Sequence, residues 1–257
     1  MSKFVDKLQR LSKSSTPPMG FHPAASESKS SSMLLIAGLS GADVKEAKIV
    51  ADSNADAGLI LRQTFDIEAI RQAAKVMGDI PLGILVKDIG KEKADKLVSL
   101  GCDFVVFDIK MPAMSLHEEG IGRFLMIAPS LDQGLVRAIN NLDVDGVFIS
   151  IGEESFITVE YLLICHRFCE LLDKPVIITL PSLVTSAELG SLWQTGIDGI
   201  VVPQEQPTEA LAEVRKTIDD LPRGARHRRG KPGVILPHHG GGIATEEDEE
   251  EEEEEEI

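Results

Sequence analysis

The stretch PVIITLPSLVTSAELGSLWQTGIDGIVV, residues 175–202, contains two short apolar runs separated by a polar, helix-favouring segment. The runs at 175–180 and 198–202 are continuous rather than alternating, which is typical of parallel strands that are covered on both faces. Between them, residues 186–195 have the periodicity of an amphipathic helix. The stretch therefore predicts a strand–helix–strand unit, from which parallel α/β folds are built.

The same unit recurs along residues 33–222. Eight apolar runs follow one another, at 33–38, 57–61, 81–86, 103–108, 123–128, 145–150, 175–180 and 198–202. Seven amphipathic helices are predicted between and after them, at 43–53, 66–77, 91–99, 131–141, 158–172, 186–195 and 208–221, with a loop at 111–122. Eight strands in regular succession favour closure, so we predict a single (β/α)₈ (TIM) barrel of the α/β class. An open doubly wound sheet, which uses the same units, is the alternative.

Short motifs mark the joints between these elements. Three helix-to-strand joints share a turn followed by Asp and then the strand: LGCDFVVF (100–107), LDVDGVFI (142–149) and TGIDGIVV (195–202). Such a repeat supports the architecture and carries no prediction of catalysis. Asp66, Ser186 and Thr208 stand where helices should begin and are predicted to be their N-caps.

The N-terminal extension, residues 1–32, differs in composition from the barrel region at 33–222. It begins with a short amphipathic helix and continues as a flexible connector rich in Ser and Pro. The apolar side of this helix consists of Phe4, Val5, Leu8 and Leu11. We expect the helix to cover the lower end of the barrel or to bind a partner; a frayed terminus is the alternative.

The C-terminal tail, residues 223–257, is basic at 223–231 and acidic at its end. Residues 246–256 supply 11 carboxylates, and without them the net charge of −16 becomes −5, from 31 acidic and 26 basic residues. Like charges at this density repel one another, so the tail is predicted to be disordered. Its two opposite charge runs suggest self-association through the termini. No nucleic acid partner is expected, because phosphate binding needs clustered Lys and Arg.

The cellular location is predicted from the lack of a membrane span or secretory signal in the sequence and from its cysteines. No stretch reaches the roughly 18–20 consecutive apolar residues of a membrane span, and the start lacks the apolar core of a secretory signal. Cys102, Cys165 and Cys169 are an odd number without zinc-ribbon spacing, which fits a reducing compartment. We therefore expect a soluble cytoplasmic protein with no metal site.

Polar residues after the predicted strands indicate where an active site would lie, because barrels of this kind carry it at the C-terminal ends of their strands. Asp108 and Lys110 are the sharpest pair, since period-two geometry puts both on one side of an extended strand. Asp108 could hold Lys110 charged for an anionic intermediate, or a desolvated Lys110 could attack a carbonyl, with Lys87 assisting. The alternative is a structural salt bridge at the rim.

Four further residues are predicted to bind the substrate: Arg62, Glu153, Thr179 and Ser182. Glu153 could also be a general base, or it could cap the helix that starts near residue 158. These residues favour a lyase or oxidoreductase that acts on a small anionic or carbonyl metabolite. The alternative is a non-catalytic binding or assembly protein on a barrel that has lost its phosphate or flavin site.

Three segments resemble the flavin-dependent, aldolase-type barrels of the nitronate monooxygenase and inosine-phosphate dehydrogenase type. They are LLIAGLSGADVKEAKIVADSNADAGLIL (34–61), VDGVFISIGEES (144–155) and KPVIITLPSLVTSAELGSLWQTGIDGIVVPQ (174–204). The resemblance implies FMN as cofactor, with glycines ending the seventh and eighth strands so that backbone amides approach a phosphate. Leu180-Pro181 and Val202-Pro203 stand at those positions, and proline has no amide donor. The catalytic His implied after the sixth strand is also absent, so these positions depart from the pattern of a phosphate and flavin site.

Overall fold

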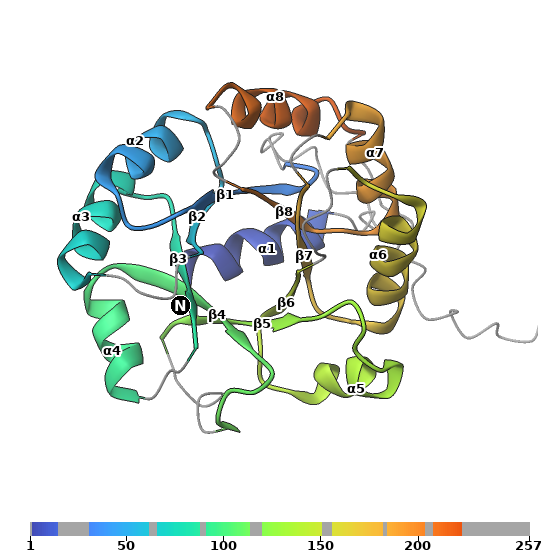
Figure 1. The fold of residues 1–257 in the computed structure, drawn as a ribbon, viewed down its shortest axis with the longest axis horizontal. Helices are drawn as coiled ribbons and strands as arrows, with labels where there is room; N and C mark the ends of the chain where they lie inside the picture. The colour runs from blue at the N-terminus through green and yellow to red at the C-terminus, as the bar shows by residue number, and fades with distance from the viewer. Residues whose placement is uncertain are drawn as a thin grey trace, which may run out of the picture.

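The strands of the protein form a closed parallel barrel in the order β1 to β8, and β8 pairs with β1 (Figure 1). The computed structural model describes residues 2–14, 31–61, 66–87, 91–113, 120–150, 156–181, 184–203 and 208–222. The strands are β1 (Leu34–Leu39), β2 (Ala57–Ile60), β3 (Leu82–Val86), β4 (Cys102–Asp108), β5 (Gly122–Ile127), β6 (Gly146–Ile149), β7 (Val176–Thr179) and β8 (Gly199–Val202). All eight predicted strands are confirmed, and closure rules out the open doubly wound sheet.

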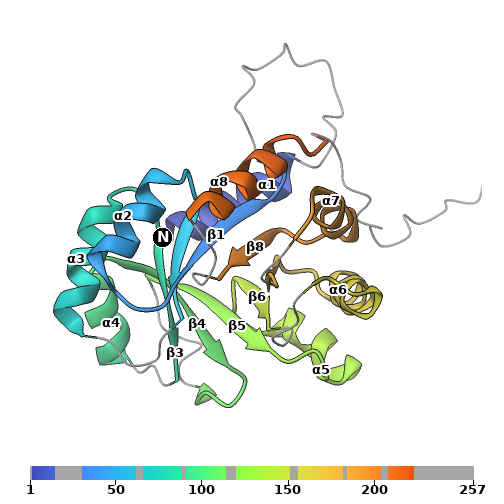
Figure 2. The ribbon, with the colours of Figure 1, turned by 45° about the horizontal axis from the view of Figure 1, so that its top comes forward.

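Helices surround the barrel as an outer ring. They are α2 (Val44–Asp52), α3 (Ile67–Met77), α4 (Lys91–Ser99), α5 (Gln133–Ala138), α6 (Val159–Leu171), α7 (Ser186–Thr195) and α8 (Thr208–Asp219), and a 3₁₀ turn at Ile139–Asn141 extends α5. Figure 2 shows α5, α6 and α7 next to one another along one side. The described residues between β4 and β5 contain no α-helix, in agreement with the predicted loop, of which residues 114–119 lie outside the description. None of the described helices is long and apolar enough to cross a membrane.

Of the three predicted N-caps, one is confirmed. Thr208 is the first residue of α8 itself rather than a cap before it. Asp66 is the N-cap of α3 and accepts a hydrogen bond from the amide of Glu68, as predicted. The cap of α7 is Thr185 rather than Ser186, so that prediction was one residue late. The Thr185 hydroxyl accepts from the Glu188 amide, and the Glu188 carboxylate accepts from the Thr185 amide, which completes a capping box. Hydrogen bonds from Thr185 also hold the pKa of Glu188 below its ordinary value.

Apolar side chains form two cores, one on each side of the strand wall. The outer core lies between strands and helices, and includes Ile60, Phe107 and Phe168. The inner core fills the barrel and consists of residues that point toward its axis: Leu34, Ile36, Ala57, Leu59, Phe104, Val106, Phe124, Phe148, Ile177 and Val201. Continuous apolar runs supply both cores, because neighbouring residues of a strand face opposite sides.

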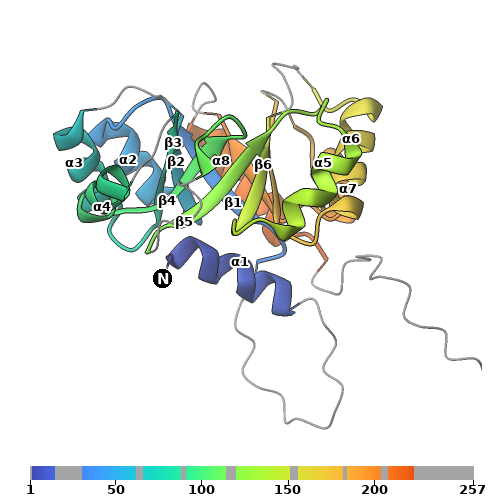
Figure 3. The same ribbon diagram turned by 90° about the horizontal axis from the view of Figure 1, so that it is seen from below.

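The N-terminal helix α1 (Lys3–Ser14) closes the lower end of the barrel (Figure 3). Its apolar side chains, Phe4, Val5, Leu8 and Leu11, are buried and belong to the inner core. The Phe4 ring stacks on Phe104 with 4.3 Å between centroids and lies 5.2 Å from Phe124. The expectation that this helix covers the barrel end is therefore confirmed.

Aspartates at the starts of three even-numbered strands tie each strand to a neighbour. The side chains of Asp56, Asp145 and Asp198 accept hydrogen bonds from the amides of Leu35, Arg123 and Val176, at 2.9, 2.7 and 2.9 Å respectively. These bonds satisfy amides at the ends of the ladder that have no strand partner there. The repeated Asp of the helix-to-strand joints thus has an architectural role.

Asp103, at the start of β4, has a different partner. Its carboxylate accepts from the amides of Lys3 and Phe4, at 2.8 and 2.9 Å, and from the Ser2 hydroxyl at 2.7 Å. Asp103 therefore serves as the N-terminal cap of α1, although it lies about a hundred residues away in sequence. One carboxylate thus fixes where the helix enters the barrel.

Candidate functional site at the C-terminal mouth

Four of the predicted site residues lie at the end of the barrel opposite α1. Lys87 follows β3, Asp108 ends β4, Lys110 follows it in a turn, and Thr179 ends β7. The other three, Arg62, Glu153 and Ser182, lie outside the described residues. The structure thus brings part of the predicted site to one rim.

Lys87 and Asp108 are neighbours across the β3–β4 ladder. Val86 pairs with Phe107, so the next residues on the two strands face each other. Phe104 and Val106 point into the inner core, and side-chain alternation therefore turns Asp108 toward the barrel axis. Leu85 of β3 packs on the inner core, and Lys87 follows it by two positions, one residue past the end of the strand. Both residues are exposed, so a cation and an anion are found at the ends of two neighbouring strands.

Lys110 does not continue the strand, contrary to the geometry expected from the sequence. The amide of Lys110 donates to the Asp108 carboxylate at 2.9 Å, and the amide of Met111 donates to the Asp108 carbonyl at 3.0 Å. An Asp side chain that accepts from the residue two positions ahead favours a turn over an extended strand. Within the described part of the chain, Asp108 forms no ion pair with Lys110 or Lys87, so the rim salt bridge is not seen either.

Thr179 is fixed in place by a hydrogen bond to its backbone carbonyl. Its carbonyl accepts a hydrogen bond of 2.6 Å from the Tyr161 hydroxyl of α6. Burial raises the pKa of Tyr161, so the phenol stays protonated and remains a donor. Thr179 follows the inner-core residue Ile177 by two positions, which turns its half-buried side chain toward the mouth. This placement is compatible with substrate binding, which stays a prediction.

The ends of β7 and β8 do not offer the phosphate cradle of the flavin-dependent barrels. The Leu180 amide donates to the Val201 carbonyl at 2.8 Å, and the next residue on each strand end is Pro181 or Pro203. The described residues at these strand ends therefore do not fit an FMN phosphate. Nor do three or more His, Cys, Asp or Glu side chains gather anywhere in the described ranges to hold a metal ion.

Comparison with known proteins bears on the fold. No protein-family model matches the chain, and no curated protein matches it. Among solved structures, a mutant tryptophan synthase alpha-subunit from Pyrococcus furiosus matches with a TM-score of 0.59 and 15% identity, over 74% of this chain and 98% of that one. A structure from Aquifex aeolicus matches with a TM-score of 0.59 and 16% identity, over 85% of this chain and 98% of that one. The chain has a (β/α)₈ barrel fold. At 15–16% identity the similarity shows the fold alone and neither a family nor an activity. The resemblance to the flavin-dependent barrels stays a prediction.

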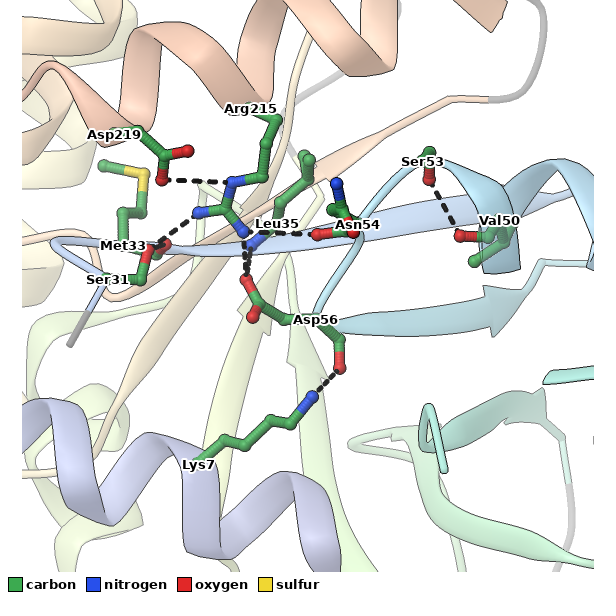
Figure 4. A network of polar contacts seen from close by, with 10 residues as sticks. All are labelled: Lys7, Ser31, Met33, Leu35, Val50, Ser53, Asn54, Asp56, Arg215 and Asp219. Atoms are coloured by element: carbon green, nitrogen blue, oxygen red, sulfur yellow. Dashed lines mark hydrogen bonds and ion pairs between the residues drawn. The ribbon is translucent and has the colours of Figure 1, made fainter. Parts of the chain in front are cut away.

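A second polar cluster lies at the N-terminal end of the barrel, where β1, β2, α1 and α8 meet (Figure 4). The Arg215 guanidinium donates to the Asp56 carboxylate at 2.8 Å, to the Ser31 hydroxyl at 2.7 Å and to the Asn54 carbonyl at 3.4 Å. Its Nε lies 3.4 Å from the Asp219 carboxylate. These partners tie α8 to the first two strands. Because this end of such a barrel serves stability rather than catalysis, we assign the cluster a structural role.

Lys7 joins this cluster from α1 and makes docking of the helix depend on pH. Its ammonium donates to the Asp56 carbonyl at 2.7 Å, while desolvation by burial lowers its pKa. Between this lowered pKa and the ordinary value near 10.5, the unfolded chain binds more protons than the folded one. Stability from this group therefore rises with pH through that window.

We expect the substitution Lys7→Met to remove this dependence. Relative to the Met variant, the parent protein should gain free energy of unfolding as the pH rises from the lowered pKa of Lys7 toward 10.5. Urea unfolding of both proteins over this pH range measures the difference. A constant difference at every pH would show that the buried ammonium carries no desolvation penalty.

Proposed function

We propose that this barrel binds a small anionic or carbonyl metabolite at its C-terminal mouth and acts on it as a lyase or oxidoreductase. The observation that carries the proposal is the position of Lys87 and Asp108, which directly follow Val86 and Phe107, the last paired residues of β3 and β4. An exposed ammonium above an apolar barrel interior suits an anionic group or a polarised carbonyl oxygen. A neighbouring carboxylate suits proton transfer at the atom beside it.

The roles of the remaining site residues follow from their positions. The carboxylate of Asp108 is oriented by the amide of Lys110, which occupies one of its two oxygens. Lys110, Thr179, Arg62, Glu153 and Ser182 are proposed to contact the substrate from the surrounding rim. Of the two reaction classes we favour the lyase, because Pro181 and Pro203 weaken the case for a flavin.

The proposal predicts opposite effects for the two central residues. With inorganic phosphate and pyruvate as probes, Lys87→Met should weaken binding about 10-fold or more, because a hydrogen bond to a charged group is lost. Asp108→Asn should tighten phosphate binding, since it removes a negative charge beside the ammonium while its amide oxygen can still accept from Lys110. Isothermal titration calorimetry measures both.

Lys3→Met is the matched control, because Lys3 is an exposed lysine at the opposite end of the barrel. It should leave both affinities unchanged. Failure of both probes to bind the parent protein, or equal losses in the Lys87 and Lys3 variants, would contradict the proposed site.

A non-catalytic binding or assembly protein is the second candidate, and the prolines at the ends of β7 and β8 favour it. An absorbance spectrum from 300 to 550 nm and mass spectrometry of any heat-released molecule distinguish the enzyme from the non-catalytic protein. Released FMN would establish an oxidoreductase-type barrel. A colourless protein that binds no small metabolite would favour assembly, and self-association through the termini, including residues 223–257, would then be tested first. In both cases we propose a cytoplasmic location, supported by the three cysteines without a disulfide framework.

A further inference from the structure

The two ends of the inner core differ in how completely they are covered. At the lower end α1 covers the core, and Phe4 and Leu8 are only 0 and 2% exposed. At the upper end three apolar side chains pack on the inner core and yet are only half-buried: Leu61, Leu85 and Met126. We call these three side chains the apolar floor. Part of the apolar surface of the barrel axis is therefore accessible at the C-terminal mouth.

Strand geometry places the apolar floor on the axis side of the barrel wall. Leu61 follows Leu59 by two residues and Met126 follows Phe124 by two, and Leu59 and Phe124 belong to the inner core. The amide of Leu61 donates to the Leu39 carbonyl at 2.9 Å, so the β1–β2 ladder continues one residue past the end of β2. The floor thus consists of side chains that regular strand backbone holds in place.

The apolar floor borders the two charged residues of the candidate site. Met126 is the partner of Asp108 in the β4–β5 ladder, and Leu85 precedes Lys87 by two residues at the end of β3. Asp108 and Lys87 are both exposed. A molecule that reaches either charge from the barrel axis therefore also lies against apolar side chains.

This combination selects for a particular class of ligand. Hydroxyl groups placed on the apolar floor would lose water without gaining a hydrogen bond, which is costly. An aliphatic or aromatic group placed there would be stabilised, because apolar surface is removed from water on both molecules. Met126 suits this role, since its flexible thioether adapts to different shapes and makes favourable contacts with aromatic rings.

We propose that the ligand of the C-terminal mouth is a small carboxylate with an aliphatic or aromatic group, which rests on Leu61, Leu85 and Met126 while the carboxylate binds Lys87. A carboxylate is favoured over a phosphate because Pro181 and Pro203 offer no amide donors for a phosphate cradle. The inference rests on the proposed function and narrows its substrate from any small anionic metabolite to an amphipathic one. The apolar floor then determines specificity.

Isothermal titration calorimetry of the full chain with pyruvate and phenylpyruvate tests the proposal, because these two 2-oxo acids differ by one phenyl group. The parent protein should bind phenylpyruvate about 10-fold or more tightly than pyruvate. Met126→Gln, a polar side chain of similar size, should bring this ratio close to one, whereas the apolar Met126→Leu should retain most of it. Val98→Gln is the matched control: Val98 is 41% exposed on the outer helix α4, and its replacement should leave the ratio unchanged.

The outcomes separate this proposal from the proposed function. Binding of neither acid to the parent protein would overturn the proposed function and this proposal with it. Equal affinities for the two acids would leave the proposed function standing and overturn the role of the apolar floor. An unchanged ratio in Met126→Gln, or an equal fall in Val98→Gln, would do the same. If Met126→Gln does not fold, Leu61→Asn replaces it, and the same loss of the ratio is expected because Leu61 lies past the end of β2.

Discussion

Replacing Phe4 by Ala is expected to lower the free energy of unfolding by about 3–5 kcal/mol, which is the usual cost of removing a buried phenylalanine. Phe4 is fully buried, stacks on Phe104 and contacts Phe124, so its removal opens a cavity at the point where α1 enters the barrel. The rings below it form a continuous series, from Phe104 through Phe124 to Phe148 with 5.6 Å between successive centroids. Loss of Phe4 therefore weakens the whole inner core. Urea unfolding followed by circular dichroism measures the loss.

Gln9→Ala provides the control for this experiment, because Gln9 is exposed on the same helix. Alanine favours helix slightly more than glutamine does, so the control should unfold at or just above the midpoint of the parent protein. Hydrogen exchange of the α1 amides adds a local readout: these amides should lose protection in the Phe4 variant. An unchanged midpoint in that variant would show that α1 contributes little to the stability of the barrel.

The fold could be predicted from the sequence because its signals are local. Continuous apolar runs such as 175–180 and amphipathic segments such as 186–195 each define an element within a dozen residues. Closure of the sheet follows from the number and order of these elements. The sequence also predicted the apolar side of α1. It did not decide whether that side packs against the barrel end or against a partner protein.

Contacts between residues that are far apart in the chain could not be predicted from the sequence. Asp103 looks like the other aspartates that precede strands, yet its carboxylate caps α1 instead of an adjacent strand amide. Lys87 was expected only to assist Lys110, because the register that sets Lys87 beside Asp108 depends on how β3 and β4 pair. The missed turn at Lys110 did have a local signal, since Asp side chains readily accept from the amide two residues ahead and so end strands.

The two apolar sides of α6 show a limit of periodicity analysis. Residues 158–172 predicted a helix correctly, but a pattern with apolar residues on both sides does not say which side meets the barrel. Only the structure shows that Tyr161 and Phe168 pack inward while Val159 and Leu163 remain exposed. Surfaces for partners are therefore harder to predict than cores.

Replacing Gly83 by Ala is expected to cost about 1–3 kcal/mol or more, because the inner core has no space for another carbon. A Cβ atom at Gly83 would lie 2.1 Å from Cε2 and 2.2 Å from Cζ of the Phe104 ring. The ring cannot move aside without separating from Phe4 on one side and Phe124 on the other. The glycine of the PLGILV run thus makes room for an aromatic side chain on the next strand. Thermal or urea unfolding of the variant measures the cost.

Two further substitutions separate overpacking from a general effect of losing a glycine. Gly190→Ala changes a glycine inside α7 where a new Cβ meets nothing within 4 Å, and it should stabilise the protein by about 0.5–1 kcal/mol. Phe104→Leu should cost less in the Gly83→Ala background than in the parent protein, because the smaller side chain relieves the clash and a double-mutant cycle records that coupling. Strictly additive effects of the two changes would mean that the barrel tolerates the extra carbon by moving its backbone. In that case the paired glycine and phenylalanine would not determine how β3 and β4 pack against α1.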